Sequence, residues 1–309
     1  MHPTPMADRK EASHVDKPFY TLDEQIALLE RRGVACDEST RDILLKEGYY
    51  PVVNGYNRSF LDATASLRAG DDRFREGTTF KMIYRAFLFD RGLRELTFRY
   101  LTRIEAVLRS TCSYRFCKRH PGLHDYLRTS CYTDKNSYLG GAENWDRDLI
   151  GLINTLDAVS QDAESNKAGV RWYVTHHDGV PLWVLVGELT FGNTRHLFDL
   201  LERPVQQAVC ADIARLMHPE QQDERYITPA WLSRALKTLV EARNICAHDD
   251  RLFNHEFADG SDFLDVLQLM DRLITPAEAA ERDAAIGRLA ERYLDDIPQI
   301  RRLVMRDTD

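Results

Sequence analysis

An arginine, a polar residue directly after it and a histidine four residues further on stand out in the segment 241–254. Arg243 and Asn244 precede His248, near the end of a stretch whose apolar spacing predicts a helix over residues 228–247. Histidine has an unperturbed pKa of about 6.5 and exchanges protons near neutral pH. The fixed fork of donors on arginine matches phosphate oxygens. These residue types fit proton transfer beside a bound phosphate.

Helical geometry limits how the two key residues meet. Arg243 and His248 are five residues apart, which places them about 140° apart around a regular helix. They therefore straddle a face unless the helix ends between them, and a cleft between two subunits would let both contribute. Asn244 lies four residues before His248, hence on the same helix face, where it would orient the imidazole or hold a phosphate oxygen.

Two other arginine–histidine pairs share the bare spacing. Arg115 with His120 lacks a polar residue after the arginine, and Arg119 with His124 is interrupted by Pro121. A proline inside a helix removes a hydrogen bond and clashes with the preceding turn. The sequence thus predicts one complete motif per chain.

A purely structural interpretation of the motif stays open at this point. Arg243 and Asn244 would tie a helix end to its neighbours, and the helix dipole would favour His248 at the C-terminus. Asp249 and Asp250 follow directly. Adjacent carboxylates raise the pKa of a histidine but also repel phosphate. Asp250 would pair with Arg251, or either aspartate would orient the imidazole.

A long stretch with steps of three and four between apolar residues predicts a helix over residues 79–120. Between Lys81 and His120 ten Lys or Arg face three acidic residues, a net charge of +7, which leaves −15 for the rest of the chain. Such asymmetry suits an RNA-binding face on an acidic protein, or a helix that pairs with acidic helices elsewhere. Glu105 and Arg109 have the spacing of an intrahelical ion pair.

The extended pattern Arg-Asn-x-Cys-Ala-His-x-x-Arg-Leu-x-Asn over residues 243–254 resembles the motif of Abi-like (AbiD/AbiF-type abortive-infection) proteins. Its core resembles the R-x(4–6)-H motif of the HEPN ribonuclease superfamily. Other blocks in the same order are similar to that family, and the resemblance runs from about residue 17 to 255. These blocks are residues 17–32, 48–56, 84–94, 104–110 and 181–192.

The resemblance implies a defence protein that cleaves RNA without a metal or cofactor, by attack of the ribose 2′-hydroxyl on the adjacent phosphate. It implies His248 as general acid and base, Arg243 as the phosphate clamp and Asn244 beside them. HEPN families act as dimers, which implies a homodimer. The residues expected to support the site or to bind RNA are Glu105 (supporting) and Arg94, Arg103, Arg109 and Arg251 (RNA).

Two alternatives come from other functional classes. The chain would be a non-catalytic RNA-binding defence protein that holds a structured small RNA, with Arg243 as a phosphate ligand only. It would otherwise be a scaffold that binds an antitoxin protein. Under the main hypothesis the expected partners are RNA, a second copy of the chain and an antitoxin that is protein or RNA.

Composition excludes several classes of protein. The chain has 309 residues, 43 % of them hydrophobic and 29 % charged, with a net charge of −8. The first residues are polar and no run of about 18 apolar residues occurs, so we expect no signal peptide, no membrane span and a cytoplasmic location. The six cysteines form no C-x-x-C pair, and His176 with His177 lacks further spaced ligands, so no metal site is predicted.

The sequence pattern predicts that the elements that position the motif are all helices. We predict an all-α, HEPN-like helical bundle at residues 76–309, preceded by a flexible leader at 1–16 and a helical extension at 17–75. Thr21 with Glu24 and Thr275 with Glu278 have the spacing of capping boxes. Further helices are expected at 39–47, 146–165, 181–201, 204–217, 261–272 and 276–296, and Gly92 is expected to kink the long helix. Loops or irregular segments are expected at 48–56, 61–77 and 121–145, and a short strand at 171–175. Trp183 and Leu189 are expected in the core.

Overall fold

The computed structural model describes residues 18–162, 164, 168–221, 223, 226–298, 300 and 301. The leader expected at 1–16 lies outside these residues. Within them the protein is an all-α helical bundle, as predicted, and its only β-type pairing is two isolated bridges. In this described part no helix has the length and apolarity to cross a membrane.

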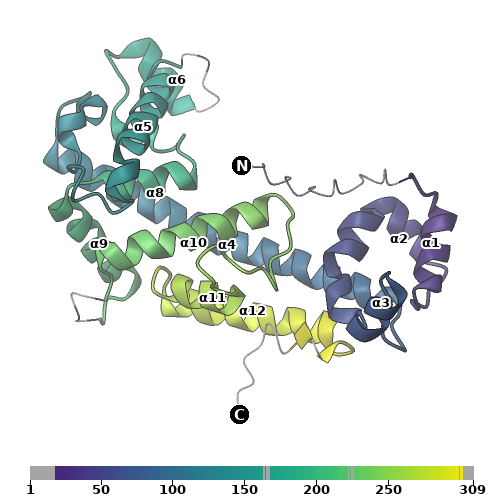
Figure 1. Cartoon of the computed structure of the whole chain (residues 1–309). Helices are drawn as coiled ribbons and strands as arrows, with labels where there is room; N and C mark the ends of the chain where they lie inside the picture. The colour runs from purple at the N-terminus through teal and green to yellow at the C-terminus, as the bar shows by residue number, and fades with distance from the viewer. Residues whose placement is uncertain are drawn as a thin grey trace, which may run out of the picture. The chain divides into compact units, whose positions relative to one another are not determined.

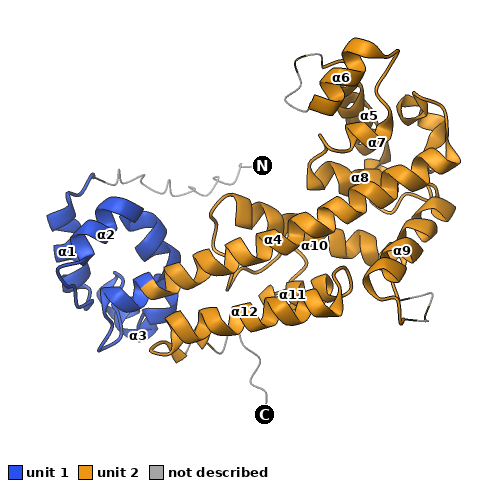
Figure 2. Cartoon of the chain, turned by 180° about the vertical axis from the view of Figure 1, so that it is seen from behind, with its two compact units in different colours: residues 1–84 blue, residues 85–309 orange. Residues whose placement is uncertain are grey.

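The chain divides into two compact units, residues 1–84 and 85–309 (Figure 2). The boundary falls within the long helix α4 (Phe80–Arg119). The extension predicted from sequence ended nine residues earlier, at residue 75. Each unit is described by itself below.

The N-terminal unit is built from short helices. Thr21 accepts a hydrogen bond from the backbone N–H of Glu24, whose side chain returns to the backbone of Thr21, so the predicted capping box is confirmed. The elements are α1 (Leu22–Arg31), α2 (Thr40–Glu47), the π-helical turn η1 (Tyr50–Asn54), the 3-10 turn η2 (Asn57–Phe60) and α3 (Ala63–Ala69).

The tyrosine-rich segment is helical, so the predicted loop at 48–56 is wrong over residues 49–56. Pro51 occupies the first turn of η1, where a missing N–H costs no hydrogen bond. Val52 and Val53 are buried, which supplies the packing that holds the turn. Tyr56 is also buried, whereas Tyr50 is 73 % exposed.

The predicted loop at 61–77 is likewise wrong over α3. Asp62 caps this helix by accepting a hydrogen bond from the N–H of Ala65 at 2.9 Å. Gly70 ends it in the left-handed conformation, with φ of +64°. An Asx cap at one end and a glycine at the other are the local signals of a short helix, and the polar composition concealed them.

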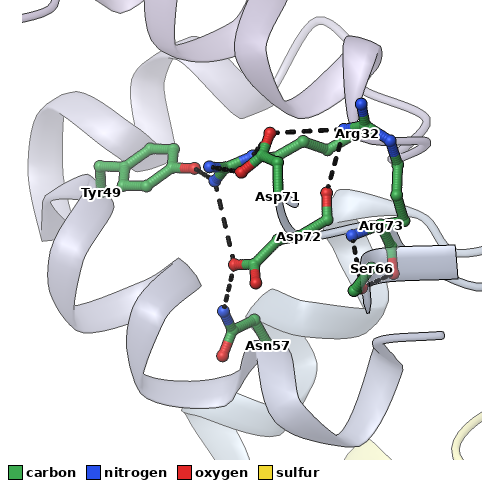
Figure 3. Close-up of polar contacts among 7 residues, drawn as sticks. All are labelled: Arg32, Tyr49, Asn57, Ser66, Asp71, Asp72 and Arg73. Carbon is green, nitrogen blue, oxygen red and sulfur yellow. Dashed lines mark hydrogen bonds and ion pairs between the residues drawn. The ribbon is translucent and has the colours of Figure 1, made fainter. Parts of the chain in front are cut away.

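A polar network holds this unit together (Figure 3). The guanidinium of Arg32 contacts Asp71 at 2.5 Å and Asp72 at 4.0 Å, and its Nη1 lies 3.5 Å from the hydroxyl of Tyr49. Asn57 donates to Asp72 at 3.1 Å. Every charged group in this network has an opposite charge or a hydrogen-bond partner.

In the second unit, α4 runs without interruption and α12 (Pro276–Leu294) lies beside it (Figures 1 and 2). The helix continues without a break through Gly92, the position at which a kink was predicted. A Cβ at Gly92 would come within 2.9 Å of a methyl carbon of Leu289 in α12. The glycine thus permits close helix packing.

The segment after α4 contains only 3-10 turns, as expected for 121–145. The strand predicted at 171–175 is wrong, because these residues belong to α6. In that helix the rings of Trp172 and His176 stack at 5.4 Å and those of Tyr173 and His177 lie 4.9 Å apart, so aromatic pairs four residues apart favour the helix. The elements are η3 (Asp125–Leu127), η4 (Thr129–Cys131), η5 (Ala142–Asn144), α5 (Trp145–Ser160), α6 (Ala168–His176), α7 (Leu182–Leu185) and α8 (Phe191–Leu200).

The last helices carry clear capping signals. Thr275 and Glu278 form the predicted capping box of α12, with Pro276 in its first turn. Thr228 caps α10 (Pro229–Ala247) through its side chain alone, by accepting from the N–H of Trp231. The remaining helices are α9 (Arg203–Met217), α10 (Pro229–Ala247) and α11 (Phe263–Asp271).

Candidate functional site

The motif lies where α10 ends. His248 is the cap residue, and its backbone N–H donates to the carbonyl of Asn244 at 3.0 Å. Asp249 adopts φ of +62°, and the N–H of Asp250 donates to the carbonyl of Ile245 at 3.2 Å. This is a Schellman ending in which an aspartate takes the left-handed position that glycine usually fills. The helix thus continues for one turn past Arg243, ends at Ala247 and presents His248 at its end.

A buried ion pair anchors this helix end to α4. Arg94 is only 3 % exposed and contacts Asp90 at 2.6 Å and Asp249 at 2.7 Å. Asp90 is fully buried and also accepts the backbone N–H groups of Leu252 and Phe253. Arg94, expected to bind RNA, therefore fixes the loop that follows His248.

Glu105 connects the motif to α4 a few turns further along. Its side chain is 4 % exposed and is bonded to Arg109, and Nε of Arg243 lies 3.8 Å from its other oxygen. The Nε–H groups of Arg109 and Arg243 are both buried and lack a hydrogen-bond acceptor. Two arginines thus share one buried carboxylate, which leaves an excess positive charge and free donors at the motif.

The other two motif residues are exposed. The amide oxygen of Asn244 accepts from Nη1 of Arg243 at 3.3 Å. The imidazole of His248 is exposed, and no hydrogen bond to it is found among the described residues. The structure therefore brings Asn244 to Arg243 and leaves the imidazole of His248 open to a ligand.

A groove begins at Arg109 and follows α4 along its boundary with α7. It encloses about 830 Å³, and the lining residues include Arg109 and Lys118 but no acidic residue. Tyr114 and Trp183 line it with side chains that are 58 % and 59 % exposed. Exposed aromatic rings between basic side chains suit stacked bases and phosphates.

Trp183 was predicted as core, and that prediction is wrong. Its neighbours Leu182 and Leu185 in α7 are buried, as is the predicted core residue Leu189. The helix has only four residues, too few to show which face is apolar. Sequence reasoning missed Tyr114, Lys118 and Trp183 as site residues, and only the aromatic and basic types interleaved along 106–118 hinted at them.

Most of the positive charge on α4 is engaged by acidic residues. Arg103 contacts Glu278 at 2.8 Å and Arg99 contacts Glu281 at 3.2 Å, both in α12. The paired-helix interpretation therefore describes this face of α4. Arg103 points toward α12, and Arg251 is half-buried in the loop after α10.

The discounted arginine–histidine pairs serve other contacts. Arg115 makes two hydrogen bonds to Asp212 of α9, at 2.5 and 2.6 Å. His120 faces Glu202 at 3.1 Å. These contacts fix the end of α4 against the start and middle of α9.

A second polar cluster joins α5 to α8. His196 of α8 lies 3.5 Å from Asp148 of α5, Arg195 contacts Asp199 at 3.2 Å, and Tyr138 donates to Asp148 at 2.7 Å. Burial raises the pKa of Asp199 to about 6, and burial together with the neighbouring Arg195 lowers the pKa of His196. Perturbed pKa values also arise in structural networks, and here the charged groups bond to one another between packed helices.

Comparison with known proteins identifies the family. A family model described as Abi-like protein matches residues 42–254. The chain belongs to the Abi-like family. The match spans most of the chain and ends with the last residue of the pattern at 243–254, and the earlier blocks from residue 48 onward also lie within it. Searches of curated proteins and of solved structures found no match.

Membership associates this Abi-like protein with abortive-infection defence. The match includes both the motif on α10 and the part of α4 that carries Glu105 and Arg109. The segment 17–41, which the sequence resemblance had included, lies outside it.

Proposed function

We propose that this Abi-like protein is a metal-independent endoribonuclease of HEPN type, the effector of a phage-defence or toxin–antitoxin system. The observation that carries the proposal is the end of α10, where an exposed His248 follows Arg243, whose Nε–H lacks an acceptor. A proton-transfer group and a fixed cation thus belong to one helix end, beside an aromatic groove with no acidic lining.

The proposed reaction requires the protein to transfer a proton and to stabilise negative charge. The ribose 2′-hydroxyl attacks the adjacent phosphorus, the bond to the 5′-oxygen breaks, and the products are a 2′,3′-cyclic phosphate and a free 5′-hydroxyl. His248 accepts the proton of the 2′-hydroxyl or supplies one to the leaving oxygen. Arg243 stabilises the negative charge that grows on the phosphoryl oxygens. Asn244, bonded to Arg243, positions the guanidinium.

The substrate strand would lie in the groove along α4. Bases stack on Tyr114 and Trp183, while Arg109 and Lys118 contact phosphates. Arg94 and Glu105 then act as positioning residues, since both are buried and bonded to groups on α4 or beside the motif. This assignment transfers the RNA contact from Arg94 and Arg103 to the lining of the groove.

We further propose that the active form is a homodimer. One imidazole cannot accept the proton from the 2′-hydroxyl and protonate the leaving oxygen at the same moment. A two-fold axis near the end of α10 would bring a second His248 to the same phosphate. Only an exposed imidazole permits this, and His248 is exposed.

The decisive experiment compares purified wild-type protein with His248→Ala on end-labelled single-stranded RNA in the presence of EDTA. We expect cleavage with cyclic-phosphate ends in the wild type and its loss in the variant. His177→Ala, which changes another exposed histidine, is the matched control and retains activity. Equal cleavage by wild type and His248→Ala would exclude the proposed mechanism.

The groove also favours the second candidate, RNA binding without cleavage, because its residues need no chemistry at His248. In that case RNA co-purifies with the protein and dissociates as salt rises. Intact co-purified RNA and no cleavage by wild type under any condition would select this alternative.

A further inference from the structure

Metal-ligating side chains of three kinds meet just after α4. His120 follows the last residue of that helix, Asp125 opens η3 and Cys131 closes η4. One imidazole nitrogen, one carboxylate oxygen and the sulfur all lie within 4.8 Å of one another. Cys131 is buried, and the other two are half-buried.

The turn that carries these residues is held in place by its own hydrogen bonds. Asp125 accepts from the N–H of Gly122 at 2.8 Å, and the N–H of Cys131 donates to the carbonyl of Arg128 at 3.0 Å. The backbone N–H of His120 donates to Phe116 at 2.8 Å. The backbone therefore already holds the three side chains near one another.

A fourth potential ligand comes from a distant part of the sequence. Oε2 of Glu202, the residue before α9, lies 3.1 Å from Nε2 of His120. A carboxylate in contact with a metal-bound imidazole either orients the ring or becomes a ligand itself. Arg119 contacts the same carboxylate oxygen at 3.2 Å, so the carboxylate is fixed from both sides.

We propose that His120, Asp125 and Cys131, with Glu202 beside the imidazole, bind a Zn²⁺ ion. Nitrogen, sulfur and carboxylate oxygen are the donor set that zinc takes in proteins. Zinc bonds of about 2.0–2.3 Å separate tetrahedral ligand atoms by roughly 3.5 Å. From separations of at most 4.8 Å, the three atoms must therefore approach by no more than about 1.3 Å, which small side-chain rotations supply.

Charge also favours a divalent cation. Two carboxylates and a thiolate would carry three negative charges, and Arg119 and Arg128 are the neighbouring cations. Zinc binding displaces the thiol proton of Cys131 to solvent, because the thiolate is the ligand. A softer donor such as sulfur favours zinc over magnesium or calcium at this position.

The ion would act as a structural cross-link, here called the clip, between the turn at 120–131 and Glu202. The turn at 120–131 has only short 3-10 elements, and Glu202 belongs to the start of α9. Coordination would strengthen the existing contact between the end of α4 and Glu202, in addition to the Arg115–Asp212 contact. None of the four residues belongs to the motif or lines the groove, so the clip does not rest on the proposed ribonuclease activity.

The test uses full-length protein and Co²⁺, which replaces zinc and absorbs light. We expect one cobalt per chain, an intense thiolate-to-cobalt charge-transfer band in the near ultraviolet, and displacement by an equal amount of Zn²⁺. Zn²⁺ at about 100 times its dissociation constant should raise the midpoint of thermal unfolding by roughly 5–10 °C. Absence of the charge-transfer band at stoichiometric Co²⁺ overturns the proposal.

Variants assign the ligands. Cys131→Ser should abolish the band and weaken binding at least about 100-fold, whereas Cys36→Ser, in the N-terminal unit, should change neither. His120→Gln should keep the thiolate band but weaken binding. If Cys131→Ser does not fold, Cys117→Ser decides the point, because loss of the band there places the thiolate at Cys117 and overturns the assignment to Cys131.

Discussion

Two arginine–carboxylate clusters in this protein look alike in composition and differ in completeness. In the N-terminal unit, two cations, Arg32 and Arg73, contact two carboxylates, Asp71 and Asp72, so the charges of this cluster balance (Figure 3). At the motif, Arg109 and Arg243 share the single carboxylate of Glu105, and both Nε–H groups lack acceptors. A charge-balanced network stabilises a fold, whereas two arginines on one carboxylate leave a surplus positive charge at the motif, which favours an anionic ligand.

The largest expected effect is on catalysis at the incomplete cluster. Arg243→Ala should lower the rate of RNA cleavage by about 10²–10³-fold, the usual cost of one transition-state donor. The free energy of unfolding should change by less than about 1 kcal/mol, because the Arg243–Glu105 contact is long and partly exposed. Single-turnover cleavage and urea unfolding measure the two quantities. A stability loss equal to the activity loss would remove the distinction between the clusters.

Next in size is RNA affinity in the groove. Trp183→Ala should weaken binding of a non-cleavable single-stranded RNA roughly tenfold to hundredfold, because one stacked base contributes about 1–3 kcal/mol. Trp172→Ala is the matched control, since Trp172 is 50 % exposed but lies on α6, outside the lining of the groove. Fluorescence anisotropy of labelled RNA gives both affinities. Equal losses in the two variants would count against binding in the groove.

A mutation in the Arg32 network should change the free energy of unfolding but not RNA cleavage. Arg32→Ala should lower the free energy of unfolding by about 1.5 kcal/mol, because Asp71 and Asp72 lose a half-buried cation while Asp71 keeps its contact with Arg73. The comparison variant Arg41→Ala removes an exposed contact with Asp23 and should cost less than about 0.5 kcal/mol. Denaturation of both variants, with cleavage measured on folded protein, tests this. Reduced cleavage by folded Arg32→Ala would assign that network a functional role.

The smallest effect tests whether an unpartnered polar atom is enough to mark a site. Asp199 is buried with one oxygen unpartnered, and burial raises its pKa to about 6. Since the folded pKa exceeds the ordinary value, the stability from this group is present below pH 4 and is lost as pH rises through 6. The contribution should fall by about 1 kcal/mol between pH 5 and pH 8.

Asp199→Asn should remove this pH dependence and leave RNA cleavage unchanged. Urea unfolding of wild type and variant at the two pH values provides the measurement. An unchanged difference between the two proteins would show that the carboxyl titrates normally. Loss of cleavage in the variant would extend the functional site to α8.

Local chemistry explains which parts of the fold could be predicted. The capping pairs Thr21–Glu24 and Thr275–Glu278 act within one turn, so the sequence alone locates them. The strand predicted at 171–175 failed because β-branched and aromatic types favour strands only when a sheet is present. Instead, ring contacts four residues apart stabilise a helix there.

The candidate site was predictable in type but not in arrangement. Arg243, Asn244 and His248 were identified by their spacing and Glu105–Arg109 by its helical interval. No interval in the sequence links Glu105 to Arg243, since helix packing brings together residues 138 positions apart. For the same reason the burial of Arg94 and the exposure of Trp183 depend on neighbours that only the folded chain supplies.

The buried carboxylate of Asp90 has a kinetic consequence. Leu252 and Phe253 lie in a segment without regular helix, yet their amide hydrogens point to this fully buried acceptor. Such amides should exchange with solvent deuterium as slowly as those inside helices, because exchange requires the α4 anchor to open. Their exchange rates would therefore report directly how often the loop after His248 detaches. Any ligand that immobilises the end of α10 would slow them further.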